Sequence, residues 1–226
     1  MSIRSTARSE ASKRTALAGT AFVAALGSLL VLAGCAAGGS SSAAPIELRL
    51  AEEPDGAVSE NAEADDAELL ADYGLEGLDA RGIVDRLDAM PVAERPAALF
   101  ASVQPGQLVV SDDRGREAEL PMPEGEFYLS IAPYEQSTHD CHFHSLTTCL
   151  GELQNESVAV RVVDDATGEA LVDETRSTFD NGFVGVWLPR GIEATVTIEH
   201  DGLTGTAQVS TAGSDDATCL TTLRLS

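Results

Sequence analysis

The chain has 226 residues, of which 14 are basic and 37 acidic, and its formal net charge at pH 7 is −23. So acidic a protein repels polyanions, and it attracts cations and cationic partners. We therefore expect no nucleic-acid partner. Charge alone does not choose among the remaining functions, because an acidic surface also serves solubility.

The first 34 residues have the features of a lipoprotein signal peptide. Basic side chains precede an apolar run over Thr15–Gly34, which ends in the lipobox sequence Leu32-Ala-Gly-Cys35. An uncleaved membrane anchor is the alternative, because the run is long enough to span a bilayer. A cysteine directly after Leu-Ala-Gly, followed by small residues, favours cleavage with Cys35 as the lipid-bearing N-terminus. We thus expect an extracytoplasmic protein on the outer face of the cell membrane, touching the membrane only through its lipid.

Cleavage leaves 192 residues with 10 basic and 36 acidic side chains, hence a formal charge of −26. This length suits one domain and a small additional segment. Residues 35–64 are rich in Gly, Ser, Ala, Pro and acid and contain no aromatic residue. Such a composition predicts a disordered tether, because it offers too little apolar surface to bury.

Residues 65–104 predict a small helical region that could also serve dimerisation. Apolar residues recur at helical spacing in two segments, first Leu69, Leu70 and Tyr73, then Ile83, Val84, Leu87 and Met90. Gly74 favours the end of the first helix, and Asp79 is a suitable N-cap for the second. A third short helix is predicted near residues 96–103. Because three short helices bury little apolar area, they should pack on the following domain or on another subunit.

The remaining residues, 105–226, have the pattern of strands and turns. Apolar runs bounded by Gly and Asp predict strands at 108–110, 117–120, 127–131, 158–162, 171–172, 183–188, 192–198, 204–210 and 219–225. Many short strands without intervening helices indicate an antiparallel β-sandwich or an open barrel. The predicted fold class is therefore α+β, with a small N-terminal helical region before a mainly antiparallel β-rich domain.

The strongest functional signal is a cluster of His and Cys. Three of the four His and two of the four Cys lie within eleven residues, His139-Asp-Cys-His-Phe-His-Ser-Leu-Thr-Thr-Cys149. If residues 139–144 are extended, Cys141 points to one face while His142 and His144 point to the other. The loop to Cys149 could then bring the second thiol back beside the first. The β-rich domain is thus the predicted metal-binding domain.

Two interpretations of the cysteines remain open. Cys141 and Cys149 could form an ordinary disulfide, since the compartment is oxidising. Cys219, which shares a strand face with Leu223 and Leu225, could be a buried apolar residue. After lipidation of Cys35, however, three cysteines remain, and an odd number leaves a free thiol. Three thiols beside imidazoles can instead form a soft site, in which thiolates select Cu(I) or accept Zn(II) and imidazole also suits Cu(II).

The cysteine-bounded loop resembles a known family. The runs Ala132-Pro-Tyr134 and Thr138-His-Asp-Cys-His-Phe-His-Ser-Leu-Thr-Thr-Cys-Leu-Gly-Glu152 are similar to the signature of CueP proteins, the copper-binding periplasmic proteins of bacteria. Shorter similar segments are Leu78–Arg81, Phe179–Gly185, Trp187–Gly191 and Cys219–Thr222. The resemblance covers roughly residues 69–226, nearly all of the predicted folded chain.

The resemblance implies a metal site that uses three cysteines, which fall here on Cys141, Cys149 and Cys219. His144 lies at a position of the motif, and His142 is an auxiliary ligand. The implied function is copper handling in the cell envelope: sequestration, and transfer to a copper enzyme such as a periplasmic superoxide dismutase. The resemblance also implies that the N-terminal region supports a homodimer.

A redox role has a physical basis as well. Two neighbouring thiolates can supply electrons to Cu(II) and become a disulfide, leaving Cu(I) for the remaining soft ligands. This chemistry is stoichiometric, so we do not expect an enzyme. The alternatives are a thiol oxidoreductase, disfavoured because Cys-x-x-Cys is missing, and a structural lipoprotein held by a disulfide. His139 is equally a ligand candidate and a surface histidine, and His200, at a predicted hairpin end, is expected to be structural.

Overall fold

The computed structural model describes residues 55–226. The predicted signal peptide, Cys35 and residues 35–54 of the predicted tether lie outside the described residues. Helix α1 (Asp55–Asp72) begins ten residues earlier than predicted, within the range assigned to the tether. None of the helices in the described part is both long and apolar enough to cross a membrane.

Helix α2 (Ala80–Asp88) forms as its sequence predicts. The Asp79 side chain accepts a hydrogen bond from the Gly82 amide at 2.8 Å, which satisfies one of the free donors of the first turn. Gly74 has φ +66° after α1, a conformation that favours glycine. Both helix boundaries were therefore encoded by local residues.

The third predicted helix is wrong. A short 3₁₀ turn, η1 (Val92–Glu94), is followed by strand β1 (Leu99–Val103). Leu99, Ala101 and Val103 are buried while the residues between them are more exposed, which is the period of a strand. Pairing with β2 (Gln107–Asp112) in antiparallel register overrides the helical propensity of this segment.

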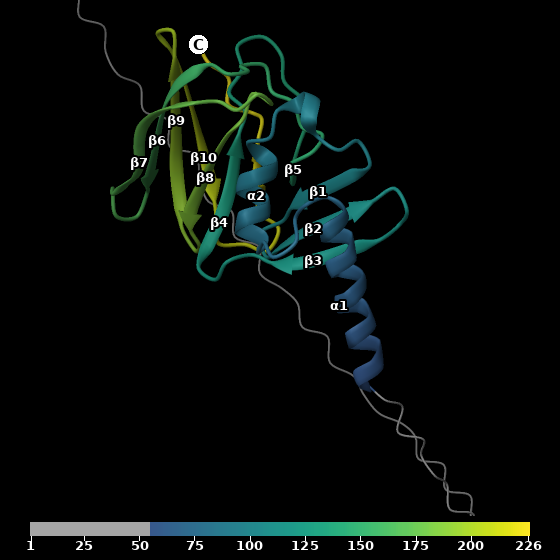
Figure 1. The fold of residues 1–226 in the computed structure, drawn as a ribbon. Helices are drawn as coiled ribbons and strands as arrows, with labels where there is room; N and C mark the ends of the chain where they lie inside the picture. The colour runs from purple at the N-terminus through teal and green to yellow at the C-terminus, as the bar shows by residue number, and fades with distance from the viewer. Residues whose placement is uncertain (1–54) are drawn as a thin grey trace, which may run out of the picture. The chain divides into compact units, whose positions relative to one another are not determined.

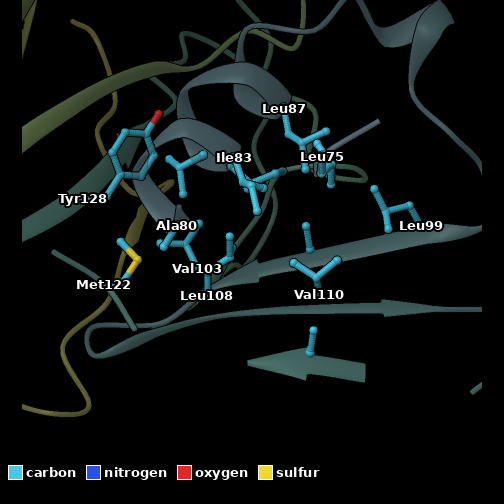
Figure 2. Close-up of a cluster of buried hydrophobic side chains, with 14 of the residues drawn as sticks. Leu75, Ala80, Ile83, Leu87, Leu99, Val103, Leu108, Val110, Met122 and Tyr128 are labelled. Carbon is cyan, nitrogen blue, oxygen red and sulfur yellow. The ribbon is translucent and has the colours of Figure 1, made fainter. Parts of the chain in front are cut away.

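The N-terminal helices pack on a sheet of their own chain. This sheet has the order β3-β2-β1-β5, with β3 at Glu117–Pro121 and the short β5 at His144–Ser145. Figure 2 shows Ile83 and Leu87 of α2 directed toward Leu108 and Val110 of β2. Each such side chain contributes about 1.5–3 kcal/mol when fully buried. The helices were expected to pack on the following domain or on another subunit. The structure shows them packed on the following domain.

Two further sheets complete the fold (Figure 1). One has the order β10-β9-β6-β7, and the other has the order β11-β4-β8. Their strands are β4 (Glu126–Ile131), β6 (Ser157–Asp164), β7 (Ala170–Ser177), β8 (Val184–Pro189), β9 (Glu193–His200), β10 (Leu203–Ser210) and β11 (Cys219–Leu220). Neighbours pair antiparallel except β11 and β4, which pair parallel. The predicted α+β class, with mostly antiparallel strands, is confirmed.

A second hydrophobic core lies between these two sheets. Buried side chains of β4 and β8, such as Leu129 and Val186, pack with those of β6 and β9, such as Val160 and Val196. A smaller cluster adjoins it, formed by Ala132, Cys149, Phe183 and Cys219, with Cys141 packed against them. The cysteines predicted to bind metal thus gather in one compact cluster of the fold.

Candidate metal centre

Backbone pairing brings Cys219 beside the histidine-rich loop. Strand β5 pairs with β1, and β11 pairs with β4, so His144 and Cys219 are both held by strands. The Cys219 amide donates to the His142 carbonyl at 3.1 Å. Thr218 connects the same elements, because its hydroxyl donates to the Val103 carbonyl at 2.6 Å and accepts from the His144 amide at 3.0 Å. Residues 75 positions apart in the chain therefore meet.

Three free thiols and one imidazole form the centre. The Sγ atoms of Cys141 and Cys149 are 3.6 Å apart, and Cys219 Sγ is 3.7 Å from His144 Nδ1. His144 and Cys219 are buried, with 0% and 3% exposure, whereas Cys141 is half-buried. The donor atoms of His144, Cys149 and Cys219 lie within 4.8 Å of one another. Ligands on a three-coordinate ion with bonds of about 2.3 Å are about 4 Å apart, so this spacing suits a soft metal ion.

The structure does not bring His142 to the thiols. Its imidazole is more than half exposed, and Nε2 lies 3.0 Å from the Asp215 carbonyl oxygen. The expectation that His142 and His144 share a face was wrong. The backbone turns between Cys141 and His144, with Cys141 Sγ 3.4 Å from the Phe143 carbonyl, so the segment does not alternate as an extended strand does.

The other histidines are divided between the centre and the β-sheet. His139, which the sequence left undecided, forms a second group of donors with Cys141 and Cys149, again within 4.8 Å. His200 closes β9, and its Nδ1 is 3.1 Å from the Ser157 carbonyl oxygen. The structural role expected for His200 agrees with this backbone contact.

Sequence reasoning missed Asp88, which orients His144. Asp88 ends α2, is fully buried, and lies 2.9 Å from His144 Nε2 through its Oδ1 atom. Tyr128 and Ser130 donate hydroxyl hydrogen bonds to Oδ2, and the Asn181 amide donates to Oδ1 at 2.7 Å. A signal was available, because Asp88 follows Val84 by one helical turn and so interrupts the apolar face of α2.

The Asp88 carboxylate fixes the protonation of His144. Burial disfavours a charged imidazole, but the adjacent carboxylate raises the pKa of His144 well above its ordinary value. Burial likewise opposes ionisation of Asp88, yet His144, Tyr128 and Asn181 hold its pKa below the ordinary value. With Nε2 donating to Asp88, Nδ1 is the ring nitrogen directed at Cys219. Carboxylates orient metal-binding histidines in the same way.

The three thiols do not ionise alike. Hydrogen bonds from Cys141 and Cys219, aided by His144, lower the pKa of Cys149. Hydrogen bonds from Cys219 to Cys141 and Cys149, together with burial, raise the pKa of Cys219. Cys149 therefore ionises more readily than Cys219. The Arg95 guanidinium lies beside Cys149, since Nη1 donates to the Cys149 carbonyl at 3.1 Å.

A cavity of about 350 Å³ reaches the centre from the surface. Cys141, His142 and Cys219 line it together with residues of β10 such as Gln208. Two of the three thiols therefore border a space large enough for a small ion with water molecules.

A cluster of thiols and imidazole, oriented by a buried carboxylate on an α+β scaffold, defines a protein that binds soft metal ions. The chain matches the family model described as periplasmic copper-binding protein CueP over residues 82–224. It therefore belongs to the CueP family of periplasmic copper-binding proteins, as its sequence predicted, and its location is extracytoplasmic.

A solved structure described as the crystal structure of S.CueP is 39% identical, with a TM-score of 0.66. The alignment covers 71% of this chain and 96% of that one. No curated protein matches the chain.

Replacing Asp88 with alanine should destabilise the metal-free protein by about 3–5 kcal/mol, because His144 loses its buried charged partner and other donors lose their acceptor. Urea unfolding followed by circular dichroism measures this change. Glu94→Ala, at an exposed acidic position, should change the free energy of unfolding by less than about 0.5 kcal/mol. Equal effects of the two substitutions would contradict a special role for Asp88.

Proposed function

We propose that this protein sequesters copper as Cu(I) through Cys141, Cys149, Cys219 and His144. The observation that carries the proposal is the meeting of three free thiols with an imidazole already oriented by Asp88. Thiolate sulfur is a soft donor and prefers Cu(I), and His144 completes such a site once the metal displaces the proton from Nδ1. The same donors accept Zn(II), which is the alternative metal.

Reduced protein should bind Cu(I) tightly in an anaerobic titration against a chromogenic chelator. Cys141→Ser, Cys149→Ser and Cys219→Ser should each weaken Cu(I) binding at least about tenfold, or about 1.4 kcal/mol, because each removes one thiolate. His142→Ala serves as the neighbouring control and should keep the original affinity, since its imidazole lies away from the donors. A structural disulfide would be favoured instead if the protein bound Cu(I) no more tightly than the chelator does and a bond between Cys141 and Cys149 resisted mild reductant.

We further propose that Cys141 and Cys149 reduce Cu(II). Formation of one S–S bond between them releases two electrons, enough for two Cu(II) ions, and their two protons pass to water. A sulfur separation of 3.6 Å supports this step, because only a small movement is needed to reach bonding distance. Cys219 and His144 remain as ligands for Cu(I). The chain consumes its own thiols, so the reaction is stoichiometric and the protein is not an enzyme.

Mixing the reduced protein with Cu(II) under argon should yield Cu(I) and remove two titratable thiols per chain. A Cu(I)-specific chelator and a thiol reagent measure the two products. Cys149→Ser should abolish both changes, whereas Ser145→Ala, in the same loop, should leave both in place. No Cu(I) and no loss of thiols in the unmutated protein would refute the redox step.

We propose that Cu(I) passes to an acceptor protein through the cavity that Cys141 and Cys219 line. An acceptor that presents its own copper ligands there, such as an extracytoplasmic superoxide dismutase, could take Cu(I) by exchange of one thiolate at a time. Homodimer formation through residues 65–104 also belongs to the proposal, on the strength of the family resemblance alone.

We also propose that the protein is lipid-anchored at Cys35. The support is the lipobox in the sequence, since Cys35 lies outside the described residues. Cells expressing the native chain should carry it in the membrane fraction, and Cys35→Ser should prevent lipidation. Mass spectrometry of the N-terminal peptide gives the direct measurement. An unmodified Cys35 in the purified native protein would contradict the anchor.

A further inference from the structure

The imidazole of His139 lacks a hydrogen-bond partner that its burial requires. Its Nε2 atom is buried, and it makes no hydrogen bond among the described residues. A buried polar nitrogen left in this way costs about 1–3 kcal/mol, so a native structure that keeps one needs a reason. One of the two ring nitrogens of His139 lies within 4.8 Å of the sulfurs of Cys141 and Cys149. A bound metal ion would explain why two soft sulfur donors lie beside an imidazole that has an unpartnered nitrogen.

The donor atoms form two overlapping groups of three rather than one. His139, Cys141 and Cys149 make the first group, and His144, Cys149 and Cys219 make the second. Cys149 is common to both. The buried ring of Phe183 contacts both imidazoles, with centroids 6.2 Å from His139 and 4.6 Å from His144. One imidazole belongs to each group.

We propose that the reduced centre holds two Cu(I) ions joined by the Cys149 thiolate. This inference rests on the proposed Cu(I) function and deepens it by adding a second metal position with His139 as a ligand. Each ion would take two sulfurs and one imidazole nitrogen, a set that suits Cu(I). A thiolate sulfur has more than one lone pair, so Cys149 can bind both ions at once.

Charge balance favours two ions over one. Counting the metal and its donors alone, three thiolates around a single Cu(I) leave two negative charges in a largely buried cluster, whereas a second Cu(I) leaves one. The half-buried Arg95 guanidinium, hydrogen-bonded to the Cys149 carbonyl, lies where it can offset that remaining charge. Burial of net charge is costly unless it is compensated, so the second ion lowers the cost of burying three thiolates together.

The test counts copper in the full chain carrying Cys35→Ser, so that every thiol counted belongs to the centre. The reduced protein, in mild detergent and without oxygen, is titrated with Cu(I) against a competing chelator. It should retain two Cu(I) per chain, and X-ray absorption should show copper scattering from a neighbouring copper. His139→Ala should retain one Cu(I) and lose that scattering. His200→Gln removes an imidazole from a backbone-bonded site elsewhere and should retain two.

The outcomes separate this inference from the proposed function. One tightly bound Cu(I) in the unmutated protein, or two that persist in His139→Ala, would overturn the second position while leaving Cu(I) sequestration intact. Retention of no Cu(I) would overturn both. The absorption measurement on the unmutated chain needs no substitution, so poor folding of a variant cannot obscure the answer.

Discussion

The buried pair of Asp88 and His144 is the interaction on which the centre depends. It joins the end of α2 to β5, and both side chains are excluded from water. An isolated buried charge would be strongly destabilising, so each residue requires the other. Tyr128, Ser130 and Asn181 add hydrogen bonds from β4 and the segment before β8, which leaves the carboxylate fully satisfied. The imidazole is thereby fixed in one orientation, with Nδ1 toward Cys219.

This pair also explains why the N-terminal helices belong to the functional unit. Helix α2 buries one face on the first sheet and carries Asp88 at its C-terminal end. The hydrophobic contacts of Ile83 and Leu87 therefore set the position of a carboxylate in the metal centre. A helix that looks like a small addition to the β-rich domain acts as support for His144, a device common where metal-binding histidines need an oriented ring.

Much of the fold was readable from sequence because it is encoded locally. Asp79 and Gly74 mark helix ends through their own hydrogen bonding and backbone conformation, and period-two alternation marks the long strands. Residues 96–103 were misassigned because their short apolar run fits helix and strand alike, and the strand forms only through pairing with β2. The centre was predicted in its cysteines and His144. The misplacement of His142 and the omission of Asp88 both reflect tertiary contacts, which a linear pattern does not contain.

The donors of the centre come from two stretches of chain that are far apart. Residues 139–149 form one stretch, and Cys219 follows only after five strands, β6 to β10, and their turns. Strand β11 has just two residues, so Cys219 is held largely by its pairing with β4 and by the hydrogen bonds around Thr218. A nascent or proteolysed chain that ends before Cys219 therefore lacks one of the three thiols. Metal binding through all of these donors would therefore require a chain that is complete as far as Cys219 and folded.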